Sequence, residues 1–125
     1  MSQENKAIVE QMNRAAAEGN TDAFVEPCAE DIRWTVFGEK TVQGKAAITE
    51  WMNSTECPEP PQFTVDNMVA EGDMVVCSGD MTMKDGDGNV QPFAYCDIYR
   101  FKDGRVSELS TFIVSTAKTD RAASA

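Results

Sequence analysis

The sequence contains no histidine, and its four cysteines never form the Cys-x-x-Cys pair that is typical of zinc and haem attachment sites. Without histidine, catalytic systems of the Ser-His-Asp and Cys-His type are excluded, and so is a histidine general base. Any acid-base chemistry must therefore use Asp, Glu, Tyr, Lys or Cys. We expect neither a bound metal nor a cofactor.

Basic residues and long apolar runs are also scarce. The 11 Lys and Arg against 21 Asp and Glu give a formal net charge of -10, which repels nucleic-acid phosphates and anionic membranes alike. No stretch reaches the roughly 18 apolar residues of a membrane span, and the first residues lack the pattern of an export signal. We expect a cytoplasmic protein with reduced thiols that binds neither nucleic acid nor membrane.

The first half of the chain predicts three helices and two strands. Apolar residues recur at helical spacing from Gln3 to Glu18, over Thr21–Val25, and from Lys45 to about residue 53. Between the second and third of these segments, β-branched and aromatic residues predict a strand at 32–37 and a short one at 41–42.

The second half predicts a meander of four longer strands separated by turns rich in Gly and Asp. The expected strands are 62–70, 74–84, 90–101 and 105–115. We expect residues 116–125 to be a frayed tail. Helices followed by strands are typical of a single α+β domain over residues 1–125, with the helices on one face of a curved antiparallel sheet.

Several local motifs fit one known family. They are Gly19–Phe24, Glu30–Trp34, Gly44–Ile48, Val69–Asp73 and Asp97–Val106. With these motifs in this order, nearly the whole chain resembles the nuclear-transport-factor-2-like superfamily, in particular its SnoaL-like and ketosteroid-isomerase-like branches. The resemblance implies a cone-shaped α+β fold, or cystatin-like roll. It also implies that about three helices lie on the concave sheet face, around a pocket for a small apolar molecule.

The resemblance also identifies positions at which relatives carry catalytic groups. In ketosteroid isomerases, a helical tyrosine and a protonated aspartate of the penultimate strand hold an oxyanion, and an aspartate of the first strand is the base. Here these positions hold Met12, Asp97 and Val36, and the base position of related cyclases and epoxide hydrolases holds Thr111. The resemblance thus argues against ketosteroid isomerisation by that mechanism, and the missing histidine excludes histidine-dependent dehydration.

Asp97 is the first candidate for a catalytic residue. Strand alternation places it on the same face as Tyr95 and Tyr99, where burial would raise its pKa. A carboxyl that stays protonated near neutral pH could donate a hydrogen bond to a ligand. Alternatively, Asp97 is a structural residue that accepts a hydrogen bond from the Trp34 indole or from a tyrosine hydroxyl.

Asp80 is the second candidate, as a proton acceptor. If the turn before Asn89 pairs that residue with Lys84, Asp80 shares the pocket face with Val76 and Ser78. A single bulge would reverse the face and leave Asp80 in water at the rim.

The expected pocket lining combines these positions with apolar residues of the helices and strands, each of which the same pattern also fits as ordinary core. The set is Met12, Trp34, Val36, Ile48, Met52, Val76, Ser78, Tyr95, Tyr99, Leu109, Thr111 and Ile113.

Three functions remain open at this point. The first is a cofactor-independent isomerase, cyclase or lyase acting on a small apolar carbonyl or polyketide-like compound. The second is a non-catalytic module that binds a small hydrophobic ligand. The third is a structural or regulatory dimer whose own side chains fill the cavity.

The sheet face opposite the pocket is expected to form a homodimer, because an apolar strand face is rarely left in water. The Lys84–Asn89 register also places Cys77 directly opposite Cys96, where we expect two reduced thiols. The predicted interface residues are Val75, Cys77, Met81, Ala94, Cys96 and Ile98.

Overall fold

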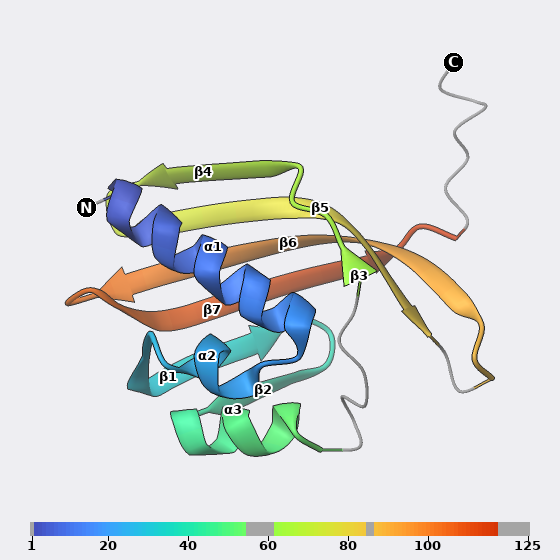
Figure 1. Cartoon of the computed structure of the whole chain (residues 1–125), viewed down its shortest axis with the longest axis horizontal. Coiled ribbons are helices and arrows are strands. Elements are labelled where there is room, and N and C mark those ends of the chain that lie inside the picture. The colour runs from blue at the N-terminus through green and yellow to red at the C-terminus, as the bar shows by residue number, and fades with distance from the viewer. Residues whose placement is uncertain (1, 55–61, 85–86, 118–125) are drawn as a thin grey trace.

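Three helices lie on one face of a seven-stranded sheet in the computed structural model, which describes residues 2–54, 62–84 and 87–117 (Figure 1). We call this the inner face and its reverse the outer face. The long strands curve around the helices, and the sheet does not close on itself. The α+β cone expected from the sequence is therefore confirmed.

The helices form where the sequence places an apolar stripe. Helix α1 (Ser2–Glu18) buries Val9 and Met12, and helix α3 (Lys45–Met52) buries Ile48. The short helix α2 (Thr21–Val25) lies between them. Over the described ranges, no helix is both long and apolar enough to cross a membrane.

The sheet has the strand order β2-β1-β7-β6-β5, and both β3 and β4 pair with β5. Neighbouring strands are antiparallel except β1 and β7, which are parallel, so the sheet is mixed rather than purely antiparallel as expected. Parallel neighbouring strands require a crossover connection. The long segment between the end of β1 and the start of β7, which includes α3 and the other strands, makes this connection. The strands are β1 (Cys28–Val36), β2 (Lys40–Gln43), β3 (Gln62–Phe63), β4 (Asn67–Glu71), β5 (Met74–Lys84), β6 (Val90–Lys102) and β7 (Arg105–Ser115).

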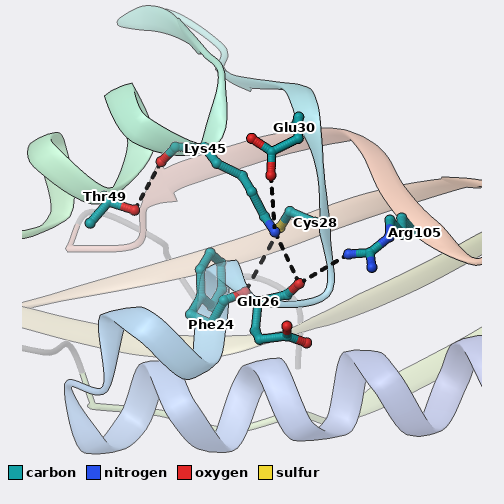
Figure 2. A network of polar contacts seen from close by, with 7 residues as sticks. All are labelled: Phe24, Glu26, Cys28, Glu30, Lys45, Thr49 and Arg105. Carbon is teal, nitrogen blue, oxygen red and sulfur yellow. Dashed lines mark hydrogen bonds and ion pairs between the residues drawn. The ribbon is translucent and has the colours of Figure 1, made fainter.

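A polar network joins the end of α2 to the starts of α3 and β7 (Figure 2). The carbonyl of Glu26, which follows α2, accepts hydrogen bonds from Lys45 Nζ at 3.2 Å and Arg105 Nη1 at 3.4 Å. Cys28 donates its thiol to the Phe24 carbonyl at 3.8 Å. Cationic side chains satisfy the carbonyls that a helix end leaves free, so this network fixes α2 against the first and last strands.

The predicted strand at 62–70 is in fact two strands, β3 and β4. Between them the chain still bonds to β5, through Thr64 N to the Asp80 carbonyl at 2.9 Å and Asp66 N to the Ser78 carbonyl at 2.8 Å. The pairing register shifts by one residue across this break. An extra residue of this kind bends a strand. The alternation of side chains in the sequence did not reveal this bend.

The break depends on a glycine in the neighbouring strand. The Thr64 carbonyl lies over Gly79 and accepts a hydrogen bond of 2.6 Å from the Tyr95 hydroxyl. A Cβ atom on Gly79 would overlap this carbonyl oxygen. A glycine within a strand often marks such a close backbone approach.

The register between β5 and β6 differs by one residue from the predicted one. Lys84 pairs with Val90 instead of Asn89, and Cys77 therefore lies opposite Asp97. The prediction that Cys77 lies opposite Cys96 is wrong. The connection between the two strands is one residue longer than the sequence pattern suggested, and a slip of one residue moves every side chain to the other face.

This slip corrects the predicted faces of β5. Val76, Ser78 and Asp80 lie on the outer face, so their predicted place in the pocket is wrong, and Asp80 is exposed opposite Ala94. Conversely, three residues predicted for the dimer interface belong to the buried core on the inner face. They are Val75, Cys77 and Met81.

Gly79→Ala should lower the free energy of unfolding by about 1–3 kcal/mol, because the added methyl group forces the Thr64 carbonyl to move. Urea unfolding of both proteins measures this difference. The matched control is Ser78→Ala on the outer face, which should change the value by less than about 0.5 kcal/mol. Wild-type stability in Gly79→Ala would contradict the close approach.

Candidate functional site

A row of polar residues crosses the middle of the inner face. Cys77, Asp97 and Thr111 lie directly opposite one another on β5, β6 and β7. Around them the inner face is formed by the hydrophobic core. The Trp34 indole, on β1, donates a 2.8 Å hydrogen bond to Thr111 Oγ1, so the row extends to a fourth strand.

Asp97 has a strongly altered affinity for its proton. Burial raises the pKa of its carboxyl from the ordinary 3.8 to about 6, although a hydrogen bond with Thr111 acts in the opposite direction. Because the Thr111 hydroxyl accepts from Trp34, its own hydrogen is available for Asp97. Trp34, Thr111 and Asp97 thus form a chain of donors that ends on the carboxylate.

One carboxyl oxygen of Asp97 has no donor within the part of the chain that the structure describes. Among the described residues, Oδ1 of Asp97 is the buried side-chain oxygen or nitrogen that lacks a hydrogen-bond partner. The donors proposed for it from the sequence are engaged elsewhere: Tyr95 with the Thr64 carbonyl, and Tyr99 with Asn13 Oδ1 at 3.4 Å. A buried acceptor without a donor costs about 1–3 kcal/mol.

The pKa of about 6 also decides what Asp97 does near neutral pH. The shift has the direction that the sequence suggested. At pH 7, however, the ionised form outnumbers the protonated form by about ten to one. Asp97 is therefore mainly a hydrogen-bond acceptor at that pH, whereas we expected a protonated donor from the sequence.

Sequence reasoning missed Asn13, which brings α1 into the site. Its Nδ2 lies 4.0 Å from Cys77 Sγ, and its Oδ1 faces the Tyr99 hydroxyl. The one available signal was a polar residue directly beside the apolar stripe of α1 at Met12. Which strand residues it meets depends on how α1 lies across the sheet.

Cys77 is not an activated nucleophile. Burial, together with the charge of Asp97, raises the pKa of its thiol to about 12. Since the thiolate is the reactive form, the thiol next to Asp97 is inert at neutral pH. Cys28, Cys77 and Cys96 are all free.

Beyond Asp97, the inner face of the sheet carries apolar side chains that are only partly buried. Trp34 contacts Trp51 edge to face with ring centroids 5.1 Å apart, and Phe63 contacts Tyr95 in the same way at 6.0 Å. The side chains of this surface are half-buried rather than sealed in the core. They are Trp34, Trp51, Met52, Phe63, Met83, Phe93 and Ile113.

The structure brings most of the predicted lining residues to the inner side, but it divides them by burial. Met12, Ile48, Tyr99 and Leu109 are sealed core side chains. Trp34, Met52 and Ile113 are half-buried, and Val76 and Ser78 lie on the outer face. The remaining three, Val36, Tyr95 and Thr111, are buried. Thr111 lies opposite Asp97, and Val36 lies opposite Thr111 on the next strand.

A separate surface groove of about 680 Å³ runs along α1. It includes Asn13 but not Asp97, Thr111 or Trp34, so it is distinct from the row of polar residues. Its other residues are Lys6, Ala7, Glu10, Gln11, Arg14, Val65 and Met68. In the part of the chain that the structure describes, no group of three or more Cys, Asp or Glu residues could hold a metal ion.

Comparison with known proteins agrees with this fold. The model of the SnoaL-like domain matches residues 9–109. An NTF2-like protein of unknown function from Cytophaga hutchinsonii is 23% identical, with a TM-score of 0.73 over 87% of this chain and 98% of the other. A search of curated proteins found no match.

Two further solved structures carry names that refer to activities. A protein assigned as a ketosteroid isomerase from Kribbella flavida is 20% identical, with a TM-score of 0.76 over 90% of this chain and 78% of the other. SalBIII, an epoxide hydrolase/cyclase-like enzyme with a role in pyran ring formation in salinomycin, is 22% identical. Its TM-score is 0.78 over 89% of this chain and 91% of the other. At these identities the similarity shows the fold alone.

Asp97→Asn should remove a pH dependence of stability. Since the folded-state pKa lies above the ordinary value, the folded protein retains this proton longer than the unfolded chain. Stability from this group is therefore greatest at low pH and falls as the pH rises through about 6. Wild type should lose roughly 2 kcal/mol of unfolding free energy between about pH 4.5 and 7.5 through Asp97, and the variant should not. Equal pH dependence in urea unfolding would contradict the raised pKa.

Proposed function

Because the chain belongs to the SnoaL-like family, we propose that it binds a small, largely apolar molecule on the inner face of its sheet, against Asp97. The observation that carries this proposal is the buried Oδ1 of Asp97, which has no hydrogen-bond partner in the described ranges. Beside it lies the half-buried apolar surface around Trp34, Phe63 and Ile113. An apolar surface with one convergent polar group is typical of small-molecule sites.

We further propose that Asp97 transfers protons as part of a cofactor-independent isomerase, cyclase or lyase reaction on a carbonyl or polyketide-like compound. A general base is most effective when its pKa lies near the working pH, and burial brings the pKa of Asp97 to about 6. Asp80 has no part in this proposal, because it is exposed on the outer face.

A non-catalytic binding module is the alternative, and one observation favours it. The titratable neighbours of Asp97 do not supply a second group that exchanges protons near neutral pH. Burial raises the pKa of the Cys77 thiol and of the Tyr95 and Tyr99 hydroxyls. A single carboxylate suits binding as well as it suits catalysis.

The two functions differ in whether bound carbonyl compounds exchange protons. With the apolar ketone 2-acetylnaphthalene in D₂O, proton NMR should show that the wild-type protein exchanges the methyl hydrogens faster than buffer. The rate should rise with pH through about 6 as Asp97 ionises. Asp97→Asn should slow the exchange about 100-fold or more, whereas Asp80→Asn should leave it unchanged.

Binding is followed in parallel samples in H₂O through the NMR signal of the Trp34 indole N–H, which reports on the hydrogen bond to Thr111. Binding without exchange would support the non-catalytic module and contradict the enzyme. A ketone that leaves the Trp34 signal unmoved up to its solubility limit would contradict the proposed pocket.

We also propose that the outer face forms a homodimer, through a set of residues that differs from the predicted one. Phe37 stacks on Phe112 with ring centroids 4.5 Å apart, and the two side chains are 51% and 40% exposed. Val69 and Val114 are more exposed still, at 62% and 64%. Large apolar side chains exposed together on one sheet face favour an interaction site, and a two-fold pairing of identical faces is its commonest use. Ala94, Cys96, Ile98 and Val76 lie on the same face.

Light scattering at micromolar concentration should therefore give the mass of a dimer. Phe112→Glu should give a monomer, because it places a charge in the centre of the apolar face. Val90→Glu is the matched control, since Val90 is 60% exposed at the far end of β6, and it should remain dimeric. A wild-type monomer would contradict the interface.

A further inference from the structure

We propose that the ligand of the Asp97 site presents a hydroxyl hydrogen to Oδ1 of Asp97, so that the site takes neutral hydroxyl compounds with a flat apolar skeleton, such as phenols and enols. This inference rests on the proposed function and names the chemical class of its ligand. In the ketosteroid-isomerase pattern the corresponding aspartate donates a hydrogen bond to the ligand. Here we assign it the opposite role.

One oxygen of the Asp97 carboxyl is left as an acceptor position. The Thr111 hydroxyl accepts from Trp34 Nε1 at 2.8 Å, so its own hydrogen is free to act on Asp97, whose pKa it lowers. Among the described residues, Oδ1 of Asp97 is buried and has no hydrogen-bond partner. Oδ1 is therefore the position at which a ligand can add a donor.

No further donor from the described ranges of the chain is ready for that position. The Tyr95 and Tyr99 hydroxyls donate to the Thr64 carbonyl and to Asn13. Burial and Thr111 account for the pKa of Asp97, without a contribution from any described lysine or arginine. A ligand hydroxyl would supply the second donor that the buried carboxylate lacks, and hydrogen bonds to charged groups are the stronger ones.

Other classes of ligand fit less well. An anion would meet an ionised carboxylate in a chain of net charge -10. A carbonyl oxygen turned toward Oδ1 would place one acceptor against another, whereas a ketone that gives up a proton to Asp97 turns a C–H group toward it. The skeleton is inferred from the rings of the half-buried surface, where Trp34 contacts Trp51 and Phe63 contacts Tyr95. Flat apolar groups pack well against such rings.

Among the side chains that surround Asp97 on the inner face, Asp97 itself is the one whose charge changes between about pH 5 and 8. Cys77 on β5 and Tyr95 and Tyr99 on β6 have pKa values raised by burial, so they stay neutral. Asn13 on α1, Thr111 on β7 and Trp34 on β1 do not titrate. Asp66, whose charge acts on Tyr95, is exposed. The pH dependence of binding therefore reports on Asp97.

The experiment compares three probes with one skeleton: 2-naphthol, 2-methoxynaphthalene and 2-naphthoate. Each is titrated into the full chain at about pH 7.5 and 5.0, with the Trp34 indole N–H signal and calorimetry as readouts. At the higher pH, 2-naphthol should bind about tenfold more tightly than its methyl ether, the size expected for a hydrogen bond to a charged acceptor. The naphthoate should bind most weakly, and the preference for the hydroxyl should shrink at the lower pH.

Three variants locate the effect. Asp97→Ala should abolish the preference for naphthol over the ether while both probes still bind. Thr111→Val, which keeps the shape but removes the hydroxyl, should reduce the preference and raise the pH at which it disappears, because Thr111 holds the pKa of Asp97 down. Asp80→Ala, on the exposed outer face, should match the wild type.

The outcomes separate this inference from the proposed function. Equal binding of naphthol and ether to the wild type would overturn the hydroxyl assignment and leave the apolar site standing. Tightest binding of naphthoate, with an increase at low pH, would show that a protonated Asp97 donates and would also overturn it. Failure of all three probes to bind would overturn the proposed function and this inference together.

Discussion

The structure depends on one constraint: the carboxyl of Asp97 is buried in the middle of the sheet, opposite Thr111. Trp34, from β1, donates to Thr111, from β7, and the Thr111 hydroxyl lowers the pKa of Asp97. Among the described residues, Oδ1 of this carboxyl has no hydrogen-bond partner. A carboxylate in this position destabilises the fold near neutral pH, and a ligand that completes its hydrogen bonding would recover part of that free energy.

The irregular edge of the sheet helps to leave that oxygen unpaired. Gly79 allows the Thr64 carbonyl to approach β5, and this carbonyl accepts the hydroxyl of Tyr95, two residues from Asp97 on the same face. Asn13 engages the hydroxyl of Tyr99 on the other side. The break between β3 and β4 is therefore linked to the chemistry of the site, since its Thr64 carbonyl takes the hydrogen of one of the two tyrosine hydroxyls that flank Asp97 on β6.

The sequence predicted those features that depend on one segment alone. The helix spacing of α1 and the alternation of Tyr95, Asp97 and Tyr99 along β6 both lie within a single element, and the structure has them as predicted. The face of Asp80 on β5 was wrong because it depended on the length of a connection, where one residue reverses the strand. Asn13 and the bond from Trp34 to Thr111 could not be predicted, because each requires the relative position of elements distant in the sequence.

The most direct test of this account is a carboxyl-selective NMR titration of Asp97 in the free protein. The account predicts a pKa near 6, because burial disfavours the charge more than Thr111 stabilises it. Ionisation near the ordinary value of 3.8 would show that water or another donor reaches the second oxygen, and would contradict the central claim. Ionisation well above neutral pH would contradict the acceptor role and restore the protonated donor expected from the sequence.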